Sequence, residues 1–253
     1  MELTAEQMEI RIGKKEIIKN VSIRVKNQQF VGLIGPNGCG KSTLLKSIYK
    51  SLVPQKGTVF LDDMDVLKTS EKKVSQQMGV VSQFNEMHFD LTVQQMVMLG
   101  RTPHKKMLES DKQADYDIVE EALTRTNLLD YRHRSFLSLS GGEKQRVILA
   151  RTIAQQPGFM ILDEPTNHLD IRYQLEILSC VKELNIGVLA ALHDLEMAAH
   201  YCDYLYAIKN GEVYTHGTPE EVLTPETIEL LYQVKCQTYI NPVTKGLGFA
   251  YGI

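Results

Sequence analysis

The sequence has little that would place it in a specialised class of protein. Lys and Arg total 28 and Asp and Glu total 31, so the net charge of -3 points neither to nucleic acid nor to an anionic membrane surface. No apolar run approaches the about 18 residues of a membrane span, and the acidic start MELTAEQMEI does not resemble a signal peptide. The four cysteines are far apart and show no CxxC or metal-ligand spacing. We therefore expect a reduced, cytosolic chain, and if it serves a membrane, it does so from outside the bilayer.

The 253 residues are 43% hydrophobic, which is enough for one large domain with a sizeable core. Short β-branched segments separated by turns fill the first third of the chain. From Thr92 to about Leu129 the pattern is mostly helical, with a helix ended by Gly100 and a polar-faced segment from Asp111 to Arg125. After residue 139, helices alternate with apolar runs such as FMILDE and GVLAAL. This alternation predicts a mostly parallel sheet with helices on both faces.

The stretch GPNGCGKST follows an apolar strand over residues 30 to 34 and precedes an amphipathic helix. It matches the pattern GxxxxGK[ST], whose glycines turn backbone N–H groups inward around phosphate oxygens. Lys41 would neutralise the β and γ phosphates and Ser42 would hold Mg²⁺, whereas Cys39 is a tolerated small residue in this loop. The residues that we assign to a nucleotide here are Gly35, Pro36, Asn37, Gly38, Cys39, Gly40, Lys41, Ser42 and Thr43.

Acidic and polar residues follow three other predicted strands. FMILDE delivers Asp163 to a strand end, where α/β sheets place ligands, so Asp163 could steady Mg²⁺ while Glu164 activates the attacking water. The alternative is a solvated strand end. Gln83 closes MGVVSQ and could ligate Mg²⁺ or the water, and His193 closes GVLAALHD and could contact the γ-phosphate. Either could instead be a satisfied surface group.

The stretch SLSGGEKQR predicts the start of a helix. Ser140 and Glu143 have the spacing of a capping box, and apolar residues follow at helical intervals. Glycine costs about 1 kcal/mol relative to alanine inside a helix, so Gly141 and Gly142 suggest either that something approaches the backbone or that the junction needs room to turn.

Together, GPNGCGKST, Gln83, LSGGEKQR, ILDEPTNHLD and His193 resemble, in order and spacing, the ATP-binding cassette (ABC) ATPases. The resemblance covers essentially the whole chain. It implies that Ser140, Gly141 and Gly142 bind the γ-phosphate of ATP held by a second copy of the chain, in a head-to-tail sandwich with two ATP molecules. The loop from Asn167 to Asp170 would then touch across that interface.

The resemblance also implies the architecture. We expect an α/β P-loop NTPase fold with a mostly parallel core sheet, an N-terminal antiparallel β-subdomain and an inserted α-helical subdomain. The single domain over 1–253 would comprise the β-subdomain and P-loop core (1–83), the helical subdomain (84–138), and the signature helix, Walker B core and C-terminal tail (139–253).

Within the family, LTVQQMVMLGRTPH and NPVTKG resemble the ATPase subunits of importers for iron-siderophore, haem or cobalamin. This implies an integral membrane permease as partner, an external substrate-binding protein as an indirect one, no nucleic acid, and a peripheral place on the cytoplasmic face of the membrane. The open alternatives are a non-transport ABC ATPase and the ATPase of another ABC transporter, such as an exporter or another vitamin or metal importer. Met87, Phe89, Met96 and Met98 either fill the subdomain core or line a groove for a permease helix.

One departure from the family concerns adenine. Family members place an aromatic ring near the end of the first strand, where this chain has Ile12. Isoleucine has no π surface for stacking.

Overall fold

A six-stranded sheet forms the centre of the computed structural model, which describes residues 1–82, 90–106, 108–167 and 169–252. The strand order is β10-β9-β3-β8-β7-β6, and every pair except β9 with β10 is parallel. The strands are β3 (Phe30–Ile34), β6 (Met78–Val81), β7 (Phe159–Asp163), β8 (Gly187–Ala191), β9 (Tyr204–Lys209) and β10 (Glu212–Gly217). All residues of β3, β7 and β8 are buried, because helices cover both faces of a parallel sheet.

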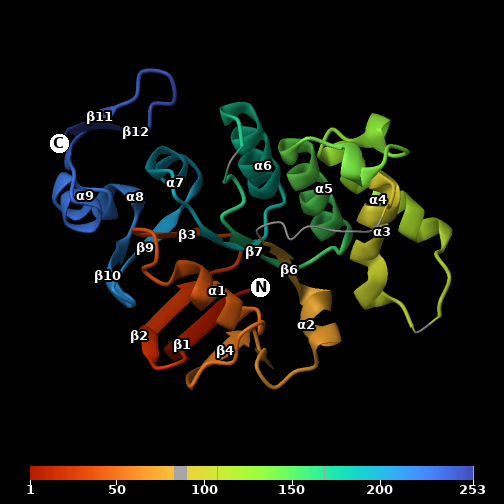
Figure 1. Cartoon of the computed structure of the whole chain (residues 1–253), viewed down its shortest axis with the longest axis horizontal. Helices are drawn as coiled ribbons and strands as arrows, with labels where there is room; N and C mark the ends of the chain where they lie inside the picture. The colour runs from red at the N-terminus through yellow and green to blue at the C-terminus, as the bar shows by residue number, and fades with distance from the viewer. Residues whose placement is uncertain (83–89, 107, 168, 253) are drawn as a thin grey trace.

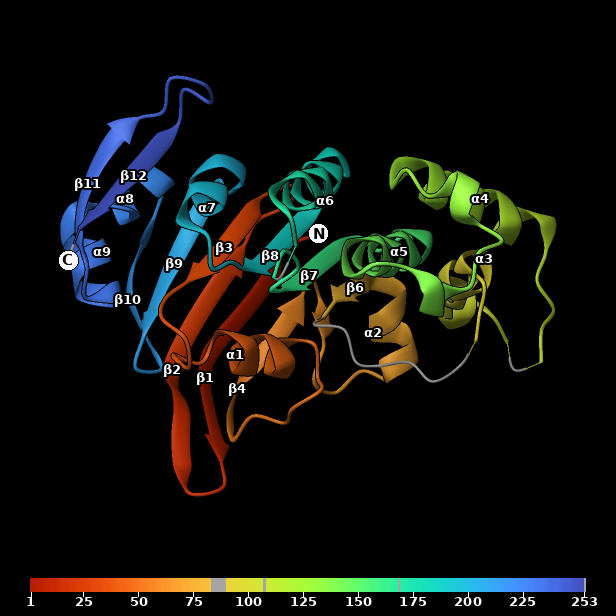
Figure 2. The same cartoon turned by 45° about the horizontal axis from the view of Figure 1, so that its top comes forward.

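Helices lie on both sides of this sheet. Figure 2 shows α5 (Gly141–Ala154), α6 (Ile171–Glu183) and α7 (Leu195–Tyr201) on one face and α1 (Lys41–Ile48) on the other. Alternate residues of β3 divide between the two cores: Phe30 and Ile34 pack with the α5 to α7 side, and Val31 and Leu33 with the α1 side. The carboxyl ends of the parallel strands therefore share one edge, at which the loops of the candidate site gather.

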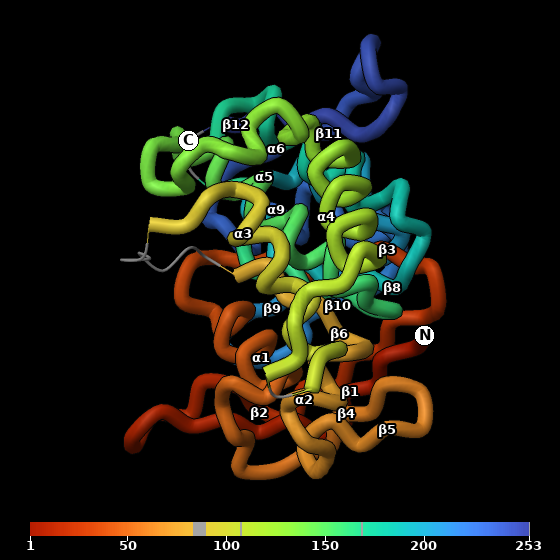
Figure 3. Tube along the Cα trace, turned by 90° about the vertical axis from the view of Figure 1, so that its right-hand side faces the viewer, coloured from red at the N-terminus to blue at the C-terminus, as the bar shows by residue number. Residues whose placement is uncertain are grey.

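The N-terminal part forms a second, antiparallel sheet in the order β2-β1-β4-β5. Its strands are β1 (Leu3–Ile12), β2 (Lys15–Val25), β4 (Lys56–Leu61) and β5 (Met64–Asp65), and α2 (Glu71–Gln77) follows it. In Figure 3 this sheet lies below the parallel sheet, and α1 lies between them. The predicted short strands are confirmed, and β1 continues across several bulges or irregularities in its pairing with β2.

The inserted helices pack against α5 at one end of the molecule (Figure 1). They are α3 (Val93–Met98), the 3₁₀ segments η1 (Leu99–His104), η2 (Leu129–Tyr131) and η3 (Phe136–Ser138), and α4 (Gln113–Arg125). A buried ion pair fixes them, since Arg101 donates to Asp115 at 3.1 Å and to the carbonyl oxygen of Ala154, the last residue of α5, at 2.9 Å. The predicted helix end at Gly100 is wrong, because the 3₁₀ segment η1 continues from Leu99 through Gly100 to His104. A Cβ on Gly100 would lie 2.1 Å from the Arg151 carbonyl oxygen, so this glycine permits close packing on α5.

The C-terminal tail forms helices and a hairpin. Two short helices, α8 (Pro219–Val222) and α9 (Pro225–Tyr232), lead to a hairpin of β11 (Lys235–Ile240) and β12 (Leu247–Gly252). Phe249 is buried, and β12 packs against α7. Within the described residues, no helix is long and apolar enough to cross a membrane.

Candidate functional site

The loop between β3 and α1 has the backbone of a phosphate cradle. Gly40, which precedes α1, has a φ of 111°, and a Cβ there would lie 2.6 Å from Cδ1 of Ile18. Gly35 is buried with a φ of 143°, and a Cβ there would lie 2.2 Å from the carbonyl oxygen of Ile208. Both glycines are therefore required by conformation and by space. The loop places the first amides of α1 toward the sheet edge.

Lys41 lies inside this loop and is only 4% exposed. Its Nζ donates hydrogen bonds to the carbonyl oxygens of Gly35 at 2.6 Å and Pro36 at 3.3 Å, and it lies 3.9 Å from Sγ of Cys39. A buried ammonium group without an anion is costly, so the loop carbonyls compensate its charge here. An incoming phosphate would offer a stronger, charge-assisted partner.

Asp163 ends β7 and carries a buried oxygen without a partner. The residue is 4% exposed, and its Oδ1 makes no hydrogen bond within the described structure. Burial raises the pKa of Asp163 and the charge of Glu164 adds to the rise, whereas a hydrogen bond from Ser42 opposes it. A buried, unsatisfied carboxylate oxygen beside a hydroxyl is suited to a hard cation such as Mg²⁺. The residues present therefore fit a magnesium ion.

Glu164 follows Asp163 with a φ of 54° and turns toward His193. Its Oε1 lies 2.5 Å from Nε2 of His193, and Nδ2 of Asn167 donates to its Oε2 at 3.0 Å. The cavity beside them has a volume of about 600 Å³. Its lining residues are Ile17, Asn37, Gly38, Gly40, Lys41, Ser42, Thr43, Glu164, Asn167 and His193. The fold thus brings the acid and the histidine, which follow Lys41 by 123 and 152 residues in sequence, to one cavity with the phosphate loop.

The turn from Ser140 to Gly142 lies apart from this cavity, since none of its residues lines it. The predicted capping box is confirmed: Ser140 Oγ accepts from the Glu143 amide at 3.3 Å, and the Ser140 amide donates to Glu143 at 2.8 Å. The two glycines differ. A Cβ on Gly142 would lie 2.7 Å from the ring of Tyr173 on α6, whereas a Cβ on Gly141 would meet nothing within 4 Å. Gly142 is therefore explained by the close approach of Tyr173, whereas no neighbour among the described residues requires a glycine at position 141.

Gln83 and Ile12 are two further residues that the sequence places at or near the site. Gln83 lies outside the described residues. Ile12 is 54% exposed and is not among the described residues that line the cavity, whereas Ile17 is. Sequence patterns missed Tyr232, whose hydroxyl accepts a hydrogen bond from the Gly35 amide at 3.0 Å across 197 residues. No local signal marks such a contact.

Comparison with known proteins agrees with this geometry. The ABC transporter family profile matches residues 18–167, more than half of the chain. This chain belongs to the ABC transporter family. Over 245 residues it is 35% identical to the ferric enterobactin transport ATP-binding protein FepC of Escherichia coli (strain K12), covering 95% of this chain and 90% of that protein. The predicted membership of the ABC ATPases is confirmed.

Two further similarities bear on the branch of the family and on the fold. The chain is 37% identical over 248 residues to the cobalamin import ATP-binding protein BtuD of Halobacterium salinarum (strain ATCC 29341 / DSM 671 / R1), covering 96% of this chain and 62% of that protein. A solved chain from a metal-chelate type ABC transporter in an inward-facing conformation shares 25% identity at a TM-score of 0.86, covering 99% of this chain and 97% of that one. The predicted fold class is confirmed.

Proposed function

We propose that this ABC ATPase energises uptake of an iron-siderophore, haem or cobalamin type substrate through a separate membrane permease. The observation that carries the proposal is the cavity that Lys41, Ser42 and Glu164 line. The buried Asp163, whose Oδ1 is unsatisfied, directly precedes Glu164 and accepts a hydrogen bond from Ser42. The names of FepC and BtuD support an importer of this class over an exporter or a non-transport ATPase. A peripheral position on the cytoplasmic face, below the permease and its external binding protein, follows from that assignment.

The residues proposed to act on the nucleotide each have a chemical task. Lys41 exchanges its loop carbonyls for the β and γ phosphates, and the loop amides that follow Gly35 hold the remaining oxygens. Glu164, whose carboxylate accepts a hydrogen bond from Asn167, takes a proton from the attacking water. His193, paired with Glu164 here, contacts the γ-phosphate when ATP is bound. Ser42 and Asp163, with Gln83, would hold Mg²⁺, which supplies neutralisation of phosphate charge.

The position of the Ser140 turn supports an ATP sandwich between two copies of the chain. Since this turn does not line its own chain's cavity, it is available to the phosphate on a second copy. The open space at Gly141 leaves room for a phosphate oxygen at the first turn of α5, where amides and the helix dipole favour an anion. The side chain of Asn167 holds Glu164 of its own chain, so the loop up to Asp170 would link the interface to the catalytic acid.

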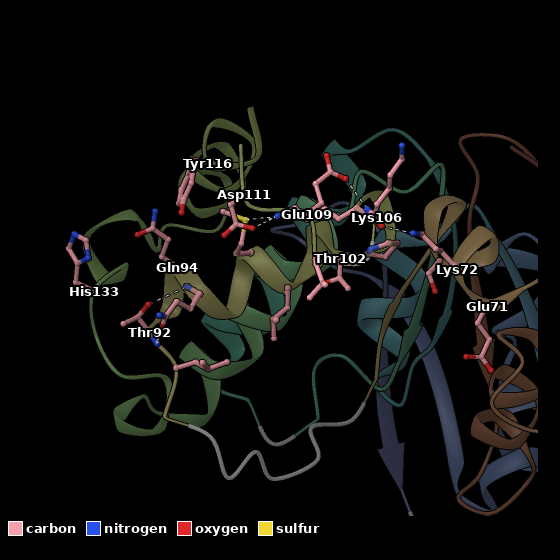
Figure 4. Close-up of a pocket in the computed structure, with 18 residues that line it drawn as sticks. Glu71, Lys72, Thr92, Gln94, Thr102, Lys106, Glu109, Asp111, Tyr116 and His133 are labelled. Carbon is pink, nitrogen blue, oxygen red and sulfur yellow. Dashed lines mark hydrogen bonds and ion pairs between the residues drawn. The ribbon is translucent and has the colours of Figure 1, made fainter. Parts of the chain in front are cut away.

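A groove of about 1070 Å³ between α2 and the inserted helices is the proposed site for the permease (Figure 4). Its lining combines polar and charged residues, such as Glu71, Lys72 and Glu109, with apolar residues such as Leu99. The two alternatives for the methionines, core filling and groove lining, each apply to one described residue. Met96 is fully buried, so it fills the core and cannot receive a permease helix, whereas Met98, 9% exposed, lines the groove. Met87 and Phe89 lie outside the described residues.

The test is Glu164→Gln, which keeps the shape of the side chain but removes the base. With Mg-ATP, the variant should hydrolyse slowly and elute as a dimer on gel filtration, while the wild type turns over. Glu183→Gln, a change of an exposed acid on α6 outside the cavity, is the matched control and should behave as wild type. A monomeric, fully active Glu164→Gln variant would contradict both the role of Glu164 and the sandwich.

A further inference from the structure

The first glycine of the phosphate loop is held by a residue from the far end of the chain. The buried amide of Gly35 donates a hydrogen bond of 3.0 Å to the hydroxyl of Tyr232, the last residue of α9. The carbonyl oxygen of Gly35 accepts from Lys41 at 2.6 Å, and the carbonyl of Ile208 closes the remaining side. Gly35 is therefore fixed at its donor, its acceptor and its α-carbon.

Tyr232 is itself held firmly. It packs against the larger of the two hydrophobic cores, and Lys209 caps the end of α9 by donating to the carbonyl oxygen of Leu230 at 2.9 Å. The hairpin of β11 and β12 follows directly and is anchored on α7 through the buried Phe249. Burial raises the pKa of Tyr232, so its phenol stays protonated and uncharged at neutral pH. A neutral acceptor thus faces the Gly35 amide.

We propose that Tyr232 is a positioning residue for ATP, which holds the phosphate loop in its binding conformation before the nucleotide arrives. The inference rests on the proposed ATP site and adds the C-terminal segment to it. A buried amide without an acceptor is strongly disfavoured, so without the hydroxyl the free loop rearranges to satisfy the Gly35 amide elsewhere. Binding must then restore the cradle, and affinity falls by the free energy of that rearrangement.

The test compares two tyrosines that differ in what their hydroxyls hold. Tyr232→Phe keeps the ring and removes only the acceptor of the Gly35 amide. Tyr201→Phe is the matched control, because that hydroxyl is also partly buried and bonded, to Ser179 at 2.9 Å and to the Leu175 carbonyl at 3.3 Å, but contacts no part of the loop. Titration calorimetry gives the Kd for Mg-ADP, and steady-state assays give KM and kcat for ATP. Thermal unfolding without nucleotide gives the loss of fold stability.

Tyr232→Phe should raise the Kd for ADP and the KM for ATP together, by about two- to tenfold, which corresponds to the net worth of one hydrogen bond. Its kcat should stay close to wild type, since Glu164 and the metal ligands are untouched. Tyr201→Phe should change neither constant, although both variants lower the melting temperature. Unchanged ADP affinity in folded Tyr232→Phe would show that the contact is only structural and would overturn the inference while leaving the ATPase proposal intact. A wild-type chain that bound no ADP would instead overturn the proposed function.

Discussion

The two glycines at the start of α5 allow a prediction that separates folding from function. A Cβ on Gly142 would lie 2.7, 3.1 and 3.2 Å from three ring atoms of Tyr173, and the guanidinium of Arg146, 4.9 Å from the ring centroid, limits where that ring can move. Overpacking of this kind costs about 1 to 3 kcal/mol. Gly141→Ala meets open space at an ordinary helical φ, so the better helix propensity of alanine should stabilise the fold by up to about 1 kcal/mol.

The free energies of unfolding, from urea titrations, should therefore differ between the two variants by about 2 kcal/mol, with Gly142→Ala the less stable. Activity should follow the opposite logic for Gly141. Its new methyl group occupies the space through which the partner's phosphate approaches, so Gly141→Ala should fold well yet hydrolyse ATP at least about tenfold more slowly, the effect of losing about 1.4 kcal/mol in the transition state. Wild-type ATPase activity in a stable Gly141→Ala chain would refute the phosphate contact. Wild-type stability in Gly142→Ala would refute the role of the Tyr173 ring.

Two further predictions concern the proposed nucleotide site. Burial raises the pKa of Asp163, so the nucleotide-free chain loses stability as the pH rises from the ordinary pKa of an aspartic acid through the raised value. In EDTA, Asp163→Asn should therefore increase the free energy of unfolding at neutral pH. It should not do so at low pH, where Asp163 is protonated in both the folded and the unfolded state. An equal gain at both pH values would contradict the buried charge as its cause. Ile12→Tyr should tighten ATP binding by about 0.5 to 1.5 kcal/mol, measured by calorimetry, if the ring reaches adenine. Unchanged affinity would indicate that another residue, such as Ile17, holds the base.

The parallel sheet and its loops could be predicted because local physics determines them. A five-residue apolar run such as FVGLI must be buried on both faces, and the glycines that follow it permit only a tight loop before a helix. The capping box of Ser140 and Glu143 is equally local, and its two hydrogen bonds are present. The roles of the cavity residues stay predictions that the proposed experiments address.

Other features depend on contacts that no local pattern encodes. Gly100 has the sequence signature of a helix end, yet a glycine is required there because the Arg151 carbonyl of α5 leaves no room for a side chain. NPVTKG has the composition of a polar tail, but it forms the turn between two paired strands, of which β12 packs against α7 and buries Phe249. The partner of the Gly35 amide lies 197 residues away. Sequence reasoning fails at these places because the determining neighbour is tertiary.

The clamp on the last turn of α5 has a mechanical consequence. Arg101 donates a hydrogen bond to the Ala154 carbonyl oxygen, and Oγ1 of Thr152 donates to the carbonyl oxygen of Val80 in β6 at 3.4 Å. One end of α5 is therefore attached both to the inserted helices and to the sheet. The opposite end carries Ser140. A helix of 14 residues is about 21 Å long, so a tilt of about 10° about the clamped end would move the Ser140 turn by roughly 4 Å. That travel exceeds a hydrogen-bond length, so a slight pivot of α5 about its clamped end would suffice to make or break a contact at the Ser140 turn.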